Sequence, residues 1–311
     1  MLAATSELDV TGTVRLDDPS AVADAVCTTL HRGFGALMGG EDFLRKAFQD
    51  IKDAFWGRYP GLLQCDTPYH DLRHSLDTAL LVARMADGCR HLGEVAMSAD
   101  DAVLAVFLGL YHDIGFIRRT GEEHLNGAQL MREHEARSVE FARQYLRDSC
   151  YAARADWANL IHVTNFAVAL VDLAGRRSPE EIHVARLIGS SDLISQVSDR
   201  LYLERCRDFL YHEFSIAGFN RSRTPNGAIV VLYKDPHDLL EKTPGFYENL
   251  VRRRLESDFG GIDRALFAHF SGSNPYLESI EKNLGYLSRL IAHGELAEGL
   301  RRHPVPLMPQ R

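Results

Sequence analysis

The sequence predicts an all-α fold, and three observations carry that prediction. Apolar residues recur at three- and four-residue spacing along most of the chain from about residue 20 onward. Several of these stretches begin with residue types that cap a helix N-terminus. Only residues 228–233, Ala-Ile-Val-Val-Leu-Tyr, have the composition of a β-strand. We therefore expect a helical bundle with at most one short β element.

The composition is that of an ordinary globular protein. The chain has 311 residues, of which 45% are hydrophobic and 25% charged, so it can form one large domain or two small ones. Its net charge of -8 argues against a surface built broadly for nucleic acid or an anionic membrane. We therefore expect no nucleic-acid polymer and no membrane among its partners, although a local basic pocket is compatible with this charge.

The five cysteines and the N-terminal residues indicate a cytoplasmic protein. The cysteines are scattered, odd in number and without a Cys-x-x-Cys pair, so neither a disulfide framework nor a zinc ribbon is indicated. The N-terminus lacks the basic and apolar regions of a signal peptide. No stretch approaches 18 uninterrupted apolar residues, the length typical of a membrane span.

The first informative helix is predicted over about residues 68–87. Thr67 and Pro68 have the order typical of an N-cap and a first helical residue, and apolar residues follow at helical spacing until Gly88. On this helix His70, His74 and Asp77 fall along one stripe opposite the apolar face. One stripe can thus present two imidazoles and a carboxylate, and Asp77 either orients an imidazole or forms a plain salt bridge.

A second helix is predicted after Ser98 and is expected to be buried on nearly all sides. Ser98 and Asp101 resemble a capping box, and the apolar run AVLAVFLGLY follows. The run ends at His112 and Asp113. Two ionisable residues buried there without partners would be destabilising, and a bound metal would remove that penalty.

Three more helices are predicted on similar grounds, over about 124–147, 156–173 and 178–214. The last begins with Ser178 as N-cap and Glu181 as the acid three residues later. It carries Asp192 just after Gly189, which we expect to bend the helix.

We expect four segments along the chain. They are an irregular N-terminal arm over 1–20, a metal-binding domain over 21–215, a mostly helical extension over 216–300 packed on the same domain, and a loose tail over 301–311. The glycines and prolines between 218 and 247 mark turns around the short strand. Helical spacing resumes from about 246 to 296.

His74, His112, Asp113 and Asp192 are the candidate metal ligands. Imidazole and carboxylate ligands suit Zn, Mn, Fe, Co or Mg to different degrees. Mixed sites of this kind, with open positions, are how proteins activate a water molecule. We expect one or two divalent ions and leave their identity open.

The order and spacing of these residues resemble the HD-domain superfamily, and specifically its cyclic-nucleotide-phosphodiesterase-like branch. The resemblance covers about residues 65–215. The motif of that branch, Y-H-N-x-x-H-A-x-D, is matched at Tyr69, His70, His74 and Asp77. Asp71 replaces the asparagine and Ser75 replaces the alanine.

The resemblance implies an HD helical bundle and a metal-dependent phosphoric ester hydrolase. It implies that His70 is the general acid, that the four candidate ligands hold a first metal, and that Asp113 also bridges to a second. A metal-activated hydroxide would attack the phosphorus. The implied substrate is a small-molecule phosphoester, namely a nucleotide or cyclic nucleotide.

Two further histidines, His134 and His162, occur between the His112-Asp113 pair and Asp192. Six-ligand members of the superfamily have this order, and their middle histidines hold the second metal. The same set fits the di-iron oxygenases of this fold, which would act on a small organic substrate, but the match at His70 favours hydrolysis. A third alternative is a non-catalytic module that senses a nucleotide.

The turn after the His112-Asp113 pair leaves the substrate open. Class I phosphodiesterases continue H-D-x-x-H-x-G, whereas this chain has Phe116 at the position of the last histidine, and no clear glutamine and aromatic clamp for a purine is present. Arg118-Arg119 follow this turn and either bind a phosphate or form a solvated pair. Residues 252–254, three arginines, are expected on a solvated face. The role of the C-terminal extension and a homodimer also stay open.

Overall fold

The computed structural model describes residues 7–93, 97–175, 177–224 and 226–307. Helices dominate these residues, and the strands among them form one two-stranded sheet, so the prediction of an all-α fold is confirmed. None of the helices in these ranges is long and apolar enough to cross a bilayer.

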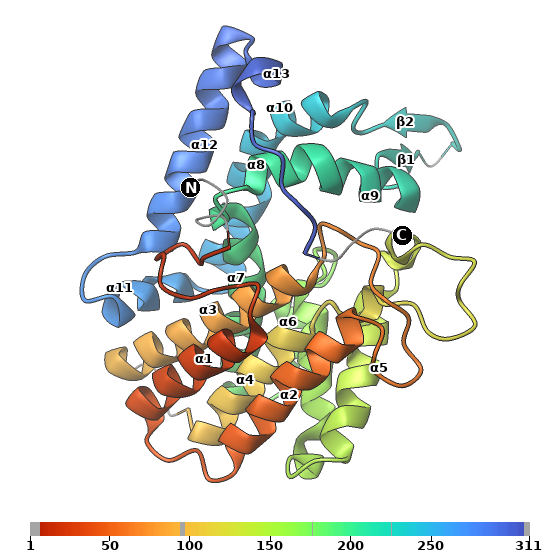
Figure 1. Ribbon diagram of the computed structural model, residues 1–311. Coiled ribbons are helices and arrows are strands. Elements are labelled where there is room, and N and C mark those ends of the chain that lie inside the picture. The colour runs from red at the N-terminus through yellow and green to blue at the C-terminus, as the bar shows by residue number, and fades with distance from the viewer. Residues whose placement is uncertain (1–6, 94–96, 176, 225, 308–311) are drawn as a thin grey trace.

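The elements follow one another in two groups, which Figure 1 shows in colours from red to green and from green to blue. The first comprises α1 (Pro19–Phe34), α2 (Gly40–Phe55), α3 (Leu72–Leu92), α4 (Ala99–Tyr111), η1 (Ile114–Phe116), η2 (Gly127–Leu130), α5 (His134–Arg147), η3 (Ala152–Thr164) and α6 (Leu170–Ala174). The second comprises α7 (Pro179–Ser198), α8 (Tyr202–Arg205), η4 (Cys206–Leu210), α9 (Tyr211–Ala217), β1 (Arg221–Arg223), β2 (Ile229–Val231), α10 (Pro236–Phe246), η5 (Tyr247–Arg252), η6 (Arg254–Asp258), η7 (Ile262–Arg264), α11 (Ala265–His269), α12 (Pro275–His293) and α13 (Leu296–Gly299).

Helix α3 lies in the centre of the fold and packs against α1, α4, α7 and α11. Its residues from Ser75 to Cys89 are all buried. The helix continues past Gly88. This glycine instead allows α11 to pack closely against α3. A Cβ atom there would lie 1.9 Å from the carbonyl oxygen of Ala265. The helix ends instead before Gly93, which takes the left-handed conformation (φ 67°) that glycine adopts without strain.

Helix α4 forms as predicted, and its C-terminal end lies in the interior of the protein. The Ser98 hydroxyl accepts a hydrogen bond from the Asp101 N–H at 3.1 Å, and the Asp101 carboxylate accepts one from the Ser98 N–H at 2.8 Å. This confirms the capping box. Residues Asp101 to Tyr111 are all buried, so the next two positions, His112 and Asp113, follow inside the protein.

Helix α7 begins at the predicted cap but ends earlier than predicted. Ser178 and Glu181 form the capping box. Gly189 leaves room for an aromatic ring, because a Cβ atom there would lie 2.4 Å from Cζ of Phe259. The helix ends at Ser198, and the expected continuation to about residue 214 is divided into α8, η4 and α9.

The C-terminal elements lie above the first group in Figure 1, with the β1–β2 hairpin projecting from them. The predicted strand appears as β2 and pairs antiparallel with β1, which had no strand-like sequence pattern. Arg254 was expected on a solvated face, and that expectation is wrong. Its buried guanidinium donates to the carbonyls of Val163, Asn165 and Val168 at 2.6, 3.0 and 2.8 Å.

Both ends of the described chain make ion pairs with the helical body. Asp9 is buried and pairs with Arg84 of α3 at 2.7 Å. Near the other end, Arg302 donates to the buried carboxylate of Glu204 at 2.7 Å. Residues 7–18 precede the first helix and contain no helix themselves.

Candidate metal centre

His70 lies before helix α3, and the predicted stripe is therefore wrong for this residue. The helix starts at Leu72 because the Asp71 side chain caps it, accepting from the His74 N–H at 3.2 Å. Thr67, the predicted cap, instead donates its hydroxyl hydrogen to the carbonyl oxygen of His70 at 2.9 Å. His70 and His74 consequently belong to different local structures and face different partners.

Three side chains from three helices converge at one point in the interior. Nε2 of His74 lies 3.2 Å from Nε2 of His112 and 3.1 Å from Oδ1 of Asp192. His112 Nε2 is 3.4 Å from the same carboxylate oxygen. The three residues are buried and form a group whose geometry could hold a metal ion.

Asp113 adds a second carboxylate to this cluster. Its Oδ2 atom lies 3.2 Å from Nε2 of His112 and 3.5 Å from Nε2 of His74. That oxygen is buried and has no hydrogen-bond partner among the described residues. A buried carboxylate oxygen without a hydrogen bond is costly, and coordination of a cation would satisfy it.

Hydrogen bonding behind the ligands orients them for a cation. His112 Nδ1 faces the carbonyl oxygen of Gly109 at 2.8 Å. The proton of a neutral ring therefore resides on Nδ1, and Nε2 directs a lone pair at the centre of the cluster. His74 Nδ1 lies 3.5 Å from the Ser195 hydroxyl. The facing atoms are thus acceptors, and this donor set fits a divalent metal.

The local charge favours a cation in the same place. Burial raises the pKa of Asp113 and of Asp192, but the adjacent His112 outweighs burial, so both pKa values are lowered. Burial lowers the pKa of His112, but the two carboxylates raise it well above its usual range. The two carboxylates are therefore ionised in this buried site, and they stabilise positive charge placed beside them.

His134, at the start of α5, lies on the other side of Asp113. Its Nδ1 faces the carbonyl oxygen of Met131 at 2.8 Å, and its Nε2 lies 3.5 Å from Oδ1 of Asp113. Burial lowers the pKa of His134 to about 4, although Asp113 acts in the opposite direction. A neutral imidazole thus faces a carboxylate, an arrangement that suits a second cation. Gly115 permits this approach, because a Cβ atom there would lie 1.9 Å from the His134 carbonyl oxygen.

His162 is the predicted ligand that the structure does not bring to the site. It lies in η3, half-buried, and is absent both from the described metal-binding group and from the cavity lining. Burial and the nearby Arg143 lower its pKa. The pattern of histidines along the chain suggested a sixth ligand, but η3 ends with other residues at the cavity, among them Thr164.

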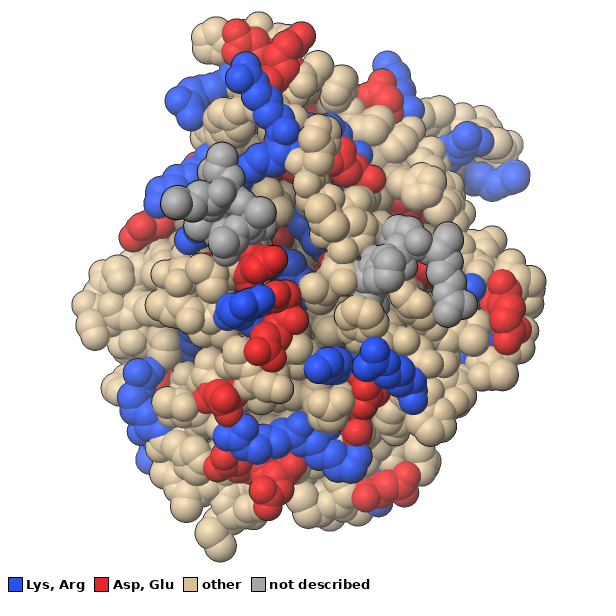
Figure 2. Space-filling view, in the orientation of Figure 1, with Lys and Arg blue, Asp and Glu red and all other residues tan. Residues whose placement is uncertain are grey.

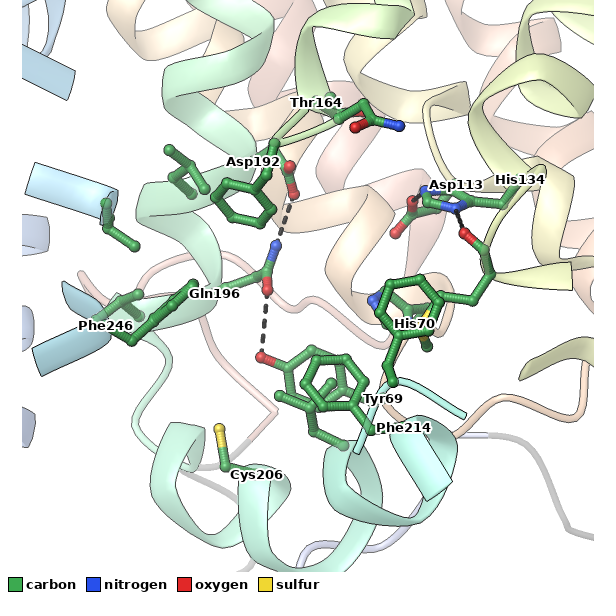
Figure 3. A pocket seen from close by; sticks show the side chains of 18 of the residues that line it. Tyr69, His70, Asp113, His134, Thr164, Asp192, Gln196, Cys206, Phe214 and Phe246 are labelled. Carbon is green, nitrogen blue, oxygen red and sulfur yellow. Dashed lines mark hydrogen bonds and ion pairs between the residues drawn. The ribbon is translucent and has the colours of Figure 1, made fainter. Parts of the chain in front are cut away.

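His70 lies beside Asp113 and His134 at the same end of the site (Figure 3), with its ring centroid 6.5 Å from that of His134, and it is held by Glu213 of α9. Its Nδ1 lies 2.6 Å from Oε2 of Glu213, whose other oxygen accepts from the Tyr69 N–H at 2.7 Å. Burial lowers the pKa of His70, but the Glu213 carboxylate outweighs burial and the net shift is upward. Glu213 was missed because it is 143 residues from His70 and belongs to no recognisable motif.

Phe116 fills the space between two of these imidazoles. Its ring stacks on His70 with centroids 4.3 Å apart and on His134 with centroids 4.2 Å apart. The ring is buried. Phe116, which occupies the position of a histidine in class I phosphodiesterases, therefore lies between His70 and His134 and separates their rings.

Arg118 and Asp77, two other residues considered from the sequence, make no described contact with the candidate metal ligands. Arg118 does not reach the site, because its guanidinium pairs with Asp66 at 3.1 Å and donates to the Leu125 carbonyl at 3.0 Å. Asp77 is buried on α3, and no described contact joins it to an imidazole. Burial raises its pKa to about 7.

A cavity of about 490 Å³ opens directly from the cluster. Its polar end is lined by Asp113 and Asp192 and by His70 and His134, the two histidines that stack on Phe116 (Figure 3). Gln196 bridges this end, donating to Asp192 at 2.7 Å and accepting from the Tyr69 hydroxyl at 3.2 Å. The remaining wall is largely apolar and includes Leu193, Val197, Leu210, Phe214, Phe246 and Val251. No local sequence pattern predicted this apolar wall.

Comparisons with known proteins agree with the fold. Residues 71–188 match the family model of the HD domain. A search of curated proteins finds no match. Among solved structures, the phosphodiesterase domain of Salpingoeca rosetta rhodopsin phosphodiesterase is similar, with a TM-score of 0.56 and 15% identity. The similarity covers 95% of this chain and 94% of that one, and at this identity it concerns the fold.

Proposed function

We propose that the chain is a metal-dependent phosphodiesterase of the HD superfamily, because residues 71–188 match the HD-domain family model and the fold is similar to that of a phosphodiesterase domain. One observation carries the proposal. The buried His and Asp cluster and His70, which is held by Glu213, lie together at the polar end of one cavity. A phosphoester bond placed there would have both ligands for a cation and a proton donor close to it.

His74, His112, Asp113 and Asp192 would hold the first metal, and Asp113 with His134 would contribute to a second. Bound metal would polarise the phosphoryl group and lower the pKa of a water molecule. His70 would donate a proton from Nε2 to the leaving oxygen, since Nδ1 faces Glu213. Glu213 favours the protonated imidazole and fixes the orientation of its ring.

The walls of the cavity support a substrate with an uncharged ring system and few phosphates. Apart from the polar end, aromatic and aliphatic side chains predominate. The two cationic residues of the lining are already engaged: Arg132 stacks on Phe219 at 4.4 Å, and Lys242 pairs with Asp238 at 2.9 Å. We therefore favour a nucleotide or cyclic nucleotide phosphodiester over a polyphosphate. The position of His162 weakens the di-iron oxygenase alternative, which rested on a six-ligand set.

The experiment is metal analysis combined with hydrolysis assays. The purified protein, reconstituted with Mn, Mg, Fe, Zn or Co, is assayed on bis-p-nitrophenyl phosphate and on cyclic nucleotides. We expect His112→Ala and Asp113→Ala to lose both metal and turnover, and His70→Ala to keep metal but lose turnover of cyclic nucleotides. Wild-type metal content and turnover in the first two variants would refute the proposal. Oxygen consumption with two bound iron ions would favour the oxygenase.

A further inference from the structure

The β1–β2 hairpin exposes an unusual run of aliphatic side chains. Ile229, Val230, Val231 and Leu232 are 59%, 45%, 50% and 41% exposed, respectively. Both strands are exposed along their whole length. An isolated two-stranded ribbon is only marginally stable in water. Contiguous exposed apolar residues of this kind mark a surface that binds something.

The register of the hairpin places positive charge beside these aliphatic residues. Arg221 pairs with Val231 and Arg223 pairs with Ile229 across the ladder. Directly opposed residues of an antiparallel pair project from the same face, so one face combines two arginines with two aliphatic side chains. The other face has Val230 opposite Ser222.

The segment differs in charge from the rest of the molecule. Residues 218–234 contain two arginines and one lysine and no acidic residue, in a chain whose net charge is -8. Figure 2 shows blue and tan side chains over the end of the hairpin that projects to the right. The expectation that no membrane is among the partners rested on net charge and does not describe this local surface.

We propose that the hairpin docks the protein on an anionic lipid bilayer. Aliphatic side chains would enter the boundary between headgroups and acyl chains, while the arginines extend their charged ends to the lipid phosphates. Self-association through this face would gather four arginines and no carboxylate of residues 218–234 in one interface, which like-charge repulsion disfavours. Single-stranded nucleic acid is disfavoured because the two strands present no aromatic ring on which a base could stack.

Docking in this way would bring the cavity close to the lipid. Phe219 and Tyr233, which directly flank the hairpin, both line the cavity. Each stacks on Phe214, with centroids 6.1 and 5.9 Å apart. The docking proposal does not depend on the reaction that the cavity supports.

The test is sedimentation of the full-length protein with vesicles of phosphatidylcholine, with and without phosphatidylserine. We expect binding that needs phosphatidylserine and weakens with added salt. Since each basic residue contributes about fivefold near an anionic surface, Arg221→Glu/Arg223→Glu should lower the partition coefficient at least about 25-fold. Ile229→Ser/Val231→Ser should also release the protein from the vesicles, because it removes two aliphatic side chains that would enter the bilayer. The side chains substituted in both variants are exposed, so the fold should be retained, which circular dichroism would check.

Matched controls carry the same changes elsewhere on the surface. Arg289→Glu/Arg301→Glu reverses two exposed charges on and beyond α12, and Val171→Ser removes an exposed aliphatic side chain. Both should bind as the unmodified protein does. The proposal is overturned if phosphatidylserine has no effect, if the controls lose binding equally, or if light scattering shows a dimer that Ile229→Ser/Val231→Ser converts to monomers.

Discussion

Replacing Glu213 with glutamine tests the role of the His70–Glu213 pair. The substitution keeps the shape of the buried side chain and an oxygen that can accept from the Tyr69 N–H, but removes the negative charge 2.6 Å from His70 Nδ1. A hydrogen bond to a charged group contributes about 1.5–3 kcal/mol, and its loss lowers the pKa of His70, which the Glu213 carboxylate raises. At pH values above the pKa, the protonated fraction of His70 then falls about 10- to 100-fold.

The assay compares two leaving groups across a pH series. Cyclic nucleotides release a poor leaving group that needs a proton, whereas bis-p-nitrophenyl phosphate releases a good one. We expect Glu213→Gln to move the alkaline limb of the kcat profile for cyclic nucleotides to lower pH, with kcat on that limb about 10- to 100-fold lower. Turnover of bis-p-nitrophenyl phosphate should change much less. Glu241→Gln, on the exposed surface of α10, is the matched control.

Two results would refute this reasoning. An unchanged alkaline limb would show that the charge of Glu213 does not set the protonation of His70. An equal loss with both substrates would show that the pair acts on something other than proton donation, such as substrate binding. Metal content should equal that of the unmodified protein, because Glu213 touches none of the candidate ligands among the described contacts.

Three further substitutions have outcomes set by packing and burial. Gly115→Ala should destabilise the protein by on the order of 3 kcal/mol and lower its metal content, because the new Cβ overlaps the His134 carbonyl oxygen; thermal unfolding and metal analysis would check both. Phe116→Ala should cost about 3–5 kcal/mol in urea unfolding, since it removes a buried ring between His70 and His134. The folded-state pKa of Asp77, about 7, exceeds its ordinary value of 3.8, so the folded state binds the proton more tightly and stability declines as pH rises from about 4 to about 7. Asp77→Asn should therefore match the unmodified protein near pH 4 and exceed its stability at pH 8 by up to about 4 kcal/mol; equal stability at both pH values would contradict this.

Features that depend on residues close together in the sequence, such as helix caps, were largely predicted from the sequence. The capping boxes at Ser98 and Ser178 form as expected because each depends on residues only three positions apart. The burial of an ionisable pair at the end of an apolar helix pointed to His112 and Asp113, whereas His74 and Asp192 were predicted from the order and spacing that resemble the HD superfamily. The start of α3 was misplaced because Thr67-Pro68 and Asp71 both offer a capping signal, and local sequence does not decide between them.

Long-range contacts set the features that the sequence did not reveal. Glu213 reaches His70 only because α9 folds back over the segment before α3. Arg254 looked like part of a charged surface, but its three hydrogen bonds depend on where the 163–168 loop runs. The apolar cavity wall combines residues of α7, η4, α9 and α10, none of which carries a distinctive local pattern.

Leu193 and Val197 share α7 with Asp192, but the rest of the named apolar wall comes from a later stretch of the chain than the candidate metal ligands. The ligands lie between residues 74 and 192, whereas Leu210, Phe214, Phe246 and Val251 come from later elements. Mutations in the later stretch can therefore reshape the cavity without touching a ligand. Such an arrangement lets substrate preference diverge between descendants of one ancestor while the chemistry is inherited intact. Among homologues of this protein, we expect the wall to vary faster than the cluster.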